Sequence, residues 1–262
     1  MATYLDRIVA AHRAGAALDR RPLEPLLEAA RAVPHVRPFS AALTSDDRLA
    51  VIAEIKRRSP SRGELAPGLE AAELAQRYQA GGAAALSVLT DAEFFGGSPA
   101  DLAQARAACD VPVLRKDFTV DARDVLDARL MGADAVLLIV AALDDHELVD
   151  LVALAADVRI EALVEVHDEA EADRALSAGA TLVGVNQRDL STFAVDRGLA
   201  RRLRPHLGSD VVAVAESGIT GSEDAAELAD AGYAAVLVGE ALVTSPDPTA
   251  AVRALHQSPV RS

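Results

Sequence analysis

Eight short apolar runs recur along the chain at intervals of roughly 20 to 35 residues, the length of one βα unit. The runs span residues 49–55, 84–90, 111–115, 135–140, 161–166, 182–186, 211–216 and 234–239. They are continuously apolar rather than alternating, which is typical of parallel strands covered by helices on the outside. The pattern therefore predicts eight buried parallel strands.

Segments with a helical period of hydrophobic positions lie between the runs. They span residues 68–82, 98–108, 121–132, 144–157, 168–179 and 222–232. Three of these segments open on a residue type that we expect to act as N-cap, namely Ser98, Asp121 and Ser222. Four of them end in a glycine suited to a left-handed C-terminal turn, namely Gly82, Gly132, Gly179 and Gly232.

Strict alternation of strand and helix indicates an α/β fold, and eight units favour closure into a single (β/α)8 TIM barrel over residues 49–256. The alternative is an open doubly wound sheet, but no GxGxxG follows the first run. Residues 1–48 contain helical stretches near 3–16 and 22–32, and we expect an N-terminal helical extension packed on the barrel. Residues 257–262 are expected to form a tail. We expect one domain in all.

Composition narrows the classes of partner. A net charge of −14 with no basic stripe argues against a nucleic-acid partner. No apolar run reaches the roughly 20 residues of a membrane span, so no membrane partner is expected. The first residues carry charges throughout and lack a signal-peptide core, and the one cysteine, Cys109, fits a reducing compartment. We expect a cytoplasmic monomer.

Lysine and asparagine are scarce. Of the 26 basic residues only Lys56 and Lys116 are lysine, and Asn186 is the one asparagine. We interpret this as a coding bias that favours arginine wherever the fold tolerates it. The remaining lysines then mark positions where an ammonium group is needed, since an ammonium can release a proton and a guanidinium cannot.

Charged and polar residues gather at the carboxyl ends of the predicted strands. They are Glu54, Lys56, Lys116, Glu165, Asn186, Arg188 and Glu216. In a barrel these ends meet at one mouth, where the active sites of this fold lie. Charges inside a barrel are costly unless they are paired. We therefore predict a catalytic group of carboxylates facing two lysines, with a structural ion-pair network as the alternative.

Other residues near the predicted mouth indicate a ligand. Glycine turns follow the last two strands, at Ser217–Gly218 and at Gly239, and match the phosphate site common in barrels. The phenylalanines Phe94, Phe95, Phe118 and Phe193 follow strands and suggest an apolar pocket for a planar ring.

The histidines show no short metal-binding spacing, so we expect neither a metal nor a cofactor. His167, just beyond Glu165, is expected to cap the following helix. Cys109 lies at a predicted helix end, and we expect it to be buried rather than nucleophilic.

The segments AEIKRRSPSRG, LSVLTDAEFFGGS, VLRKDF, GADAVLLIV, LVEVHD, GVNQRDL, VAESGI and VGEAL resemble the signature segments of the indole-3-glycerol-phosphate synthase family, in order, over roughly residues 3–256. The resemblance implies a carboxy-lyase of tryptophan biosynthesis. Its substrate would be 1-(o-carboxyphenylamino)-1-deoxyribulose 5-phosphate, which ring closure, decarboxylation and dehydration convert to indole-3-glycerol phosphate, CO2 and water. Association with other enzymes of tryptophan synthesis stays open.

The resemblance also implies roles for the residues at the strand ends. Lys116 would be the general acid that protonates the C2 carbonyl of the sugar, and Glu165 the carboxylate opposite that removes or relays a proton. Lys56, oriented by Glu54, would lie near the phosphate and the leaving hydroxyl. Residues that would hold the substrate's hydroxyl and carboxylate groups are Asn186 and Arg188, with Glu216 as a supporting carboxylate.

Two further sets follow from the resemblance. Residues that would bind the phosphate are Ser59, Ser217, Gly218 and Gly239. Residues that would line the anthranilate pocket are Phe95, Phe118, Leu137, Leu190 and Phe193. Glu240 departs from the family pattern, because a serine often follows the glycine. A carboxylate there would repel phosphate, so we expect its backbone N–H to bind while the side chain points away.

Two alternatives remain at this point. Another phosphosugar barrel, such as phosphoribosylanthranilate isomerase, would need a Cys/Asp acid–base pair, and Cys109 is misplaced on a helix. A catalytically silent phosphate-binding barrel could act as a sensor or scaffold, but both lysines facing Glu165 argue against it.

Overall fold

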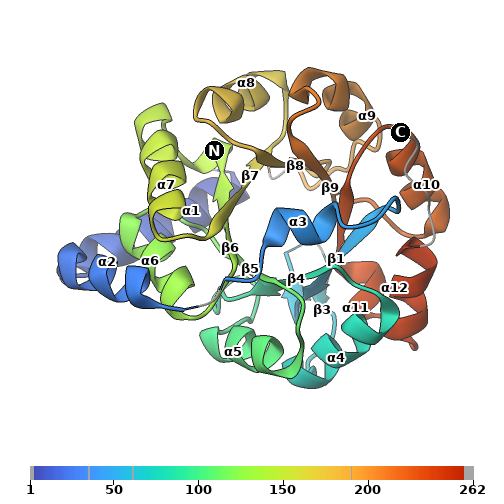
Figure 1. The fold of residues 1–262 in the computed structure, drawn as a ribbon, viewed down its shortest axis with the longest axis horizontal. Coiled ribbons are helices and arrows are strands. Elements are labelled where there is room, and N and C mark those ends of the chain that lie inside the picture. The colour runs from blue at the N-terminus through green and yellow to red at the C-terminus, as the bar shows by residue number, and fades with distance from the viewer. Residues whose placement is uncertain (1–2, 35, 61, 190, 257–262) are drawn as a thin grey trace.

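The eight predicted strands close into one parallel barrel in the computed structural model, which describes residues 3–34, 36–60, 62–189 and 191–256 (Figure 1). The strand order around the barrel is β1-β10-β9-β8-β7-β6-β5-β4. The strands are β1 (Ala50–Ile55), β4 (Ala85–Leu89), β5 (Val113–Lys116), β6 (Ala135–Ile139), β7 (Glu161–Val166), β8 (Leu182–Asn186), β9 (Val212–Glu216) and β10 (Ala235–Val238). A short antiparallel pair, β2 (Arg58–Ser59) and β3 (Gly63–Glu64), follows β1. The predicted TIM barrel is confirmed. The tail expected at 257–262 lies outside the described residues.

Helices surround the barrel (Figure 1). Those that match the predicted segments are α4 (Ala71–Gly81), α5 (Pro99–Ala108), α6 (Ala122–Leu130), α7 (Asp145–Asp157), α8 (Glu169–Ser177) and α10 (Ser222–Asp230). The others in this part of the chain are η1 (Val140–Ala142), α9 (Leu199–Leu203), η2 (Arg204–Leu207), α11 (Glu240–Val243) and α12 (Pro248–His256). Among the described residues, no helix combines the length and the apolar character that crossing a membrane requires.

Most of the predicted helix ends are confirmed. Ser98 and Asp121 accept hydrogen bonds from the N–H groups of their first turns. All four predicted glycines have positive φ, between 84° and 94°. Ser222 as N-cap was wrong, because α10 already starts at this residue and its N-cap is Gly221. The carboxylate of Asp224 instead reaches back to the N–H and hydroxyl of Thr220, both at 2.7 Å.

The interior of the barrel is apolar toward the amino ends of the strands and charged at their carboxyl ends. Along β1, Ala50 and Ile52 belong to the buried cluster inside the barrel, and Glu54 follows on the same face because strand side chains alternate. Leu163 and Glu165 repeat this order on β7. The inward columns of β1 and β7 therefore end in a polar side chain at the carboxyl end of the strand.

Helix α3 (Phe39–Leu43) closes the opposite end and lies in front of the barrel's centre in Figure 1. Phe39 and Leu43 are buried in the interior cluster. Glu161, the first residue of β7, accepts hydrogen bonds from the N–H groups of Phe39 at 2.6 Å and Ser40 at 3.0 Å. The barrel is therefore plugged at its amino end, which leaves the carboxyl end for a ligand.

The expected N-terminal extension is present and packs on the barrel. It comprises α1 (Tyr4–Leu18) and α2 (Leu23–Ala32) ahead of α3. Helix α2 packs against α6. Arg13 of α1 holds the carboxylate of Glu147 on α7 with two hydrogen bonds of 2.7 and 2.8 Å.

Candidate active site

A cavity of about 420 Å³ lies at the carboxyl ends of the strands. Of the predicted site residues that the structure describes, all but Phe94 line it: Glu54, Lys56, Ser59, Phe95, Lys116, Phe118, Leu137, Glu165, Asn186, Arg188, Phe193, Glu216, Ser217, Gly218, Gly239 and Glu240. Leu190 lies outside the described residues. The structure therefore brings together residues that span nearly 190 positions of the sequence.

Lys116 is the centre of the charged group. Its Nζ lies 2.8 Å from Oε2 of Glu165 and 3.4 Å from Oε2 of Glu216. The other oxygen of Glu165 accepts a 3.1 Å hydrogen bond from Nδ2 of Asn186. The side chains of Glu165 and Glu216 are only 1% and 2% exposed. Four side chains from four strands thus form one hydrogen-bonded group with little contact with solvent.

Burial and the close charges set the protonation states of this group. Burial lowers the pKa of Lys116, but the negative charges of Glu165 and Glu216 raise it by more. The resulting pKa is well above its usual value. Burial raises the pKa of Glu165, yet Lys116 and His167 outweigh it and bring that pKa well below its usual value. For Glu216, burial and the charge of Glu165 prevail over Lys116 and raise the pKa to about 8. At neutral pH Lys116 is therefore a cation, Glu165 an anion and Glu216 mostly protonated.

Lys56 forms an ion pair with Glu54, the residue two positions before it. Residues two apart in a strand share one face, which lets Glu54 orient Lys56. Gly239 leaves the room for this pair. A Cβ at position 239 would collide with the Glu54 carboxylate and would lie 3.0 Å from Nζ of Lys56. Gly184 does the same for Glu216, because a Cβ there would collide with Oε1 of that carboxyl.

Three loop segments expected to bind phosphate follow strands that are neighbours in the barrel. Ser59 follows β1, Gly239 follows β10, and Ser217–Gly218 follows β9. Ser217 and Gly218 both have positive φ, 64° and 77°, and Nε2 of Gln187 donates to the Ser217 carbonyl at 2.8 Å. The turn is therefore held in an unusual conformation by a side chain from β8's end.

The Glu240 carboxylate, which departs from the family pattern, lies 3.2 Å from Nε of Arg62. Arg62 and Arg197 also line the cavity, and neither was predicted. Because arginine fills nearly every basic position of this chain, the sequence offers no signal that singles out these two.

Aromatic side chains form the opposite wall. The rings of Phe95 and Phe118 lie 6.0 Å apart, and Phe193 approaches from the loop after β8 with a positive φ of 61°. Nη1 of Arg188 donates to the Phe193 carbonyl at 3.1 Å. Phe94 is not part of the lining and instead meets Tyr4 of α1 at 6.0 Å.

His167 has a different role from the expected helix cap. Asp168 is the N-cap of α8. Nε2 of His167 lies 3.5 Å from Oε1 of Glu165, and Nδ1 lies 2.9 Å from Oε2 of Glu171. The signal was present in the sequence, since His167 follows Glu165 at the same two-residue spacing that joins Glu54 and Lys56.

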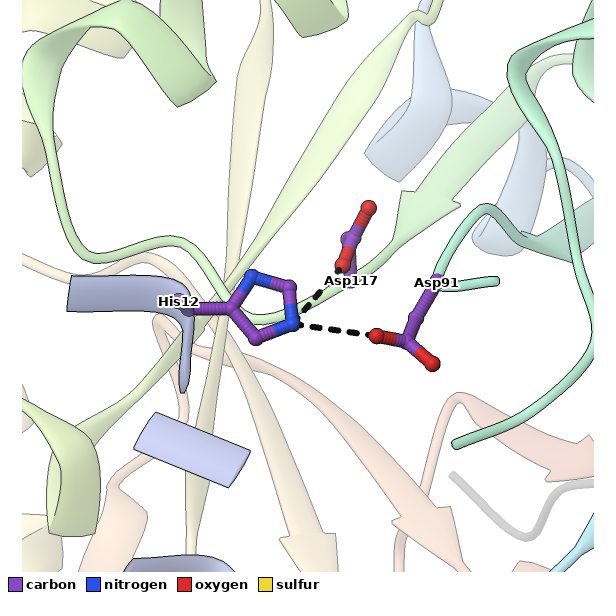
Figure 2. Close-up of side chains that lie close together, drawn as sticks. All are labelled: His12, Asp91 and Asp117. Carbon is purple, nitrogen blue, oxygen red and sulfur yellow. Dashed lines mark hydrogen bonds and ion pairs between the residues drawn. The ribbon is translucent and has the colours of Figure 1, made fainter. Parts of the chain in front are cut away.

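His12, Asp91 and Asp117 are brought together beside the cavity, and Figure 2 shows one nitrogen of the histidine ring directed at both carboxylates. Nε2 of His12 lies 3.1 Å from Asp91 and 3.9 Å from Asp117. Within the described ranges, this is the group whose ligand atoms lie close enough to hold a metal ion. Its members are far apart in the sequence, which is why no short histidine motif revealed it.

The protein itself already supplies partners to this group. Asp91 accepts the N–H of Phe94 at 2.6 Å, and Asp117 accepts Nη2 of Arg115 at 2.9 Å. Burial lowers the pKa of His12, but Asp91 and Asp117 raise it more, so the net pKa is above its usual value. His12 therefore pairs with both carboxylates and fastens α1 beside the mouth of the barrel.

The chain is similar in sequence to one family throughout its length. The family model described as Indole-3-glycerol phosphate synthase matches residues 5–255. A protein of Streptomyces coelicolor named Indole-3-glycerol phosphate synthase 2 is 55% identical over 88% of this chain and 89% of its own length. Proteins named Indole-3-glycerol phosphate synthase from Mycolicibacterium smegmatis and a Nocardioides species are each 51% identical over 96% of this chain, and over 93% and 97% of their own.

A solved structure shares the fold. The thiamine phosphate pyrophosphorylase from Pyrococcus furiosus superposes with a TM-score of 0.60, covering 82% of this chain and 95% of its own. At 17% identity this likeness supports the barrel architecture alone.

Proposed function

The chain belongs to the indole-3-glycerol phosphate synthase family, a family of decarboxylating lyases in tryptophan biosynthesis, and we propose that the cavity at the carboxyl end of its barrel carries out that reaction. The substrate is 1-(o-carboxyphenylamino)-1-deoxyribulose 5-phosphate, and the products are indole-3-glycerol phosphate, CO2 and water. The observation that carries the proposal is the buried ammonium of Lys116, held against Glu165 between an apolar wall and a glycine-rich one.

The shape of the cavity suggests how the substrate lies. Its phosphate fits the side formed by Ser59, the Ser217–Gly218 turn and Gly239, where Lys56 and Arg62 add positive charge. Its anthranilate ring fits the aromatic side, and Arg188 is near enough to the aromatic loop to meet the ring carboxylate. This placement leaves the carbon atoms that must join in the middle, above Lys116.

Ring closure then begins with a proton. Lys116 donates its proton to the C2 carbonyl oxygen, which makes C2 electrophilic enough for the carboxylate-bearing ring carbon to attack it. The new C–C bond leaves that ring carbon tetrahedral, and departure of CO2 returns the electron pair to the ring. Because Glu216 is protonated at neutral pH, Lys116 gives up its proton facing one ionised carboxylate instead of two.

Dehydration completes the indole. The former carbonyl oxygen leaves C2 as water after protonation by a lysine, and Lys56 stands on the phosphate side where it would serve this step. Loss of a proton from the intermediate to Glu165 restores full conjugation. Asn186 fixes the Glu165 carboxylate for this transfer through its 3.1 Å hydrogen bond. None of these steps changes the net oxidation state.

The experiment that tests the proposal is direct. Purified protein mixed with the synthetic substrate should give the fluorescence of indole-3-glycerol phosphate and release one CO2 per indole formed. Binding of the substrate without product would instead support a silent phosphate-binding barrel. The isomerase alternative has no support in the site, because Cys109 is buried at the C-cap of α5 and burial raises the pKa of its thiol.

We further propose that residues 1–262 form a single domain and act as a cytoplasmic monomer. The cavity is lined by residues drawn from the whole length of the barrel, between Glu54 and Thr244, which supports a single domain. The buried, unpaired Cys109 suits a reducing compartment. Light scattering after size exclusion should give the monomer mass, and thermal unfolding should show one cooperative transition.

A further inference from the structure

A partly buried pair of residues, His167 and Glu171, lies next to Glu165 and outside the cavity lining. His167 follows the end of β7, and its side chain is 14% exposed. Its Nδ1 lies 2.9 Å from Oε2 of Glu171 in the first turn of α8, and the same oxygen accepts the backbone N–H of His167 at 2.7 Å. His167 is absent from the cavity lining, so it can act on the reaction only through Glu165.

The two oxygens of Glu165 face different partners. Oε2 lies 2.8 Å from Nζ of Lys116, while Oε1 accepts the hydrogen bond of Asn186 and lies 3.5 Å from Nε2 of His167. A distance of 3.5 Å is longer than a good hydrogen bond. His167 therefore supports Glu165 as a nearby positive charge, and Glu171 fixes the ring that carries it.

The catalytic cycle gives this charge a purpose. When Lys116 has given its proton to the substrate, it is neutral, and Glu165 loses the cation that compensates it. A buried carboxylate without a compensating charge is strongly unfavourable. Glu165 would then take a proton and lose its ability to accept one later. Glu165 and Glu171, from β7 and α8, are the charged groups that face His167, and both favour its protonated form.

We propose that His167, anchored by Glu171, is a positioning residue that stays protonated and keeps the Glu165 carboxylate ionised while Lys116 is without its proton. The inference rests on the function proposed above and adds a residue pair to it. It requires His167 to be a cation at the pH of activity. The two glutamates outweigh the effect of burial and raise the pKa of His167 to about 10, in agreement with that requirement.

The test compares His167→Gln with a matched control. His206 also pairs with an acidic residue of α8, Asp173 at 2.8 Å, but this pair is exposed and remote from the cavity lining. We expect His167→Gln to lower kcat by about 10- to 100-fold, the usual cost of losing a residue that orients a catalytic group, with KM within twofold. His206→Gln should leave both constants unchanged.

The pH profile separates positioning from mere structure. Without the cation, the pKa of Glu165 rises, so the acidic limb of kcat should move up by about one pH unit or more. Glu171→Gln should shift it in the same direction, and the double variant should be no worse than His167→Gln, because Glu171 acts through His167. If kcat and its acidic limb are unchanged in a folded His167→Gln enzyme, the inference is wrong.

A spectroscopic measurement tests the protonation state of His167 without any assay of enzyme activity. In 15N-histidine-labelled enzyme, the signals missing from His167→Gln identify this ring, and they should show an imidazolium at pH 8. A neutral ring would overturn the proposal even if the variant enzyme proved too unstable for kinetics. A wild-type protein that forms no indole product while His167 is an imidazolium would overturn the proposed function instead.

Discussion

The Nζ atom of Lys116 and the Oε2 atom of Glu165 lie 2.8 Å apart in a pocket where the glutamate is 1% exposed. If Lys116 were only a structural cation, Lys116→Arg would be mild, because this chain uses arginine at nearly every other basic position. A proton donor cannot be replaced in this way, since a guanidinium does not release its proton. We expect kcat to fall at least about 100-fold, with KM and melting temperature little changed.

Arg201→Lys is the control for this exchange, because Arg201 forms an exposed ion pair with Glu227 far from the cavity lining. It should behave as wild type. Near-normal kcat in Lys116→Arg would refute both the acid role and the interpretation of lysine scarcity.

The phosphate side can be tested at Gly218, whose positive φ of 77° restricts what can replace it. Asparagine and aspartate have the same size and both tolerate this conformation better than other side chains. A Cβ would lie 2.7 Å from Val195, so both variants disturb the loop equally. Only aspartate adds a charge that repels phosphate. The KM of the Gly218→Asp enzyme should therefore exceed that of the Gly218→Asn enzyme by about tenfold or more.

Inhibition by sulfate provides a second test of the phosphate site. Sulfate should compete with the substrate in the wild type and less well in Gly218→Asp than in Gly218→Asn. Equal KM values for the two variants would remove the phosphate from this turn.

Glu216 should impose an upper pH limit on substrate capture. With its pKa raised to about 8 by burial and by Glu165, this carboxyl is neutral below pH 8 and ionised above it. Ionisation adds a negative charge to a cavity that must accept a phosphate and a carboxylate. We therefore expect kcat/KM to fall as pH rises through about 8, and Glu216→Gln to abolish that fall. Persistence of the same limb in the variant would assign it to another group.

The contact between α1 and the mouth should depend on pH through His12. Its folded pKa is raised above the unfolded value, so the contact stabilises the protein fully below pH 6.5, and the stabilisation is lost as pH rises through the folded pKa. The melting temperature of wild type minus that of His12→Gln should therefore be largest at pH 5.5 to 6 and smallest near pH 9. A difference that is constant with pH would show that only the shape of His12 matters.

Metal removal tests the same cluster independently. The proposed steps use protons alone, and the two carboxylates already have partners within the protein. Extended dialysis against EDTA should leave kcat and KM unchanged. Loss of activity that one divalent metal restores would show that His12, Asp91 and Asp117 bind an ion that the reaction needs.

The barrel could be predicted from the sequence because the strands are mainly apolar runs that recur at the length of one βα unit. The shortest helices could not. Helices α9 and α11 have five and four residues, too few for a hydrophobic period to be recognised. The predicted N-cap, Ser222, was wrong by one position, because the N-cap of α10 is Gly221. The start of this helix is held instead by the side chain of Asp224, which accepts hydrogen bonds from Thr220.

The site residues also divide into those that could be predicted from the sequence and those that could not. Glu54, Lys116 and Glu165 were predictable because inward positions at strand ends must meet in a barrel. The contact of His12 with Asp91 was not, since it depends on the position in which α1 docks. For His167 the spacing was known, but whether its ring faces Glu165 or caps α8 depends on a side-chain torsion that sequence patterns do not encode.

The strands carry the proton chemistry, whereas much of the recognition surface sits on loops, and this separation bears on how the enzyme could be re-engineered. Lys116 and Glu165 belong to strands bonded to neighbours on both sides. Phe193 projects from the connection between β8 and α9, which is held by an isolated antiparallel bridge between Arg188 and Val195. Exchanging only the residues next to Phe193, with Gln187 and Arg188 kept, should therefore yield variants that accept bulkier or substituted anthranilates at an undiminished rate of ring closure. Libraries for new indoles are best built there, with the strand ends left untouched.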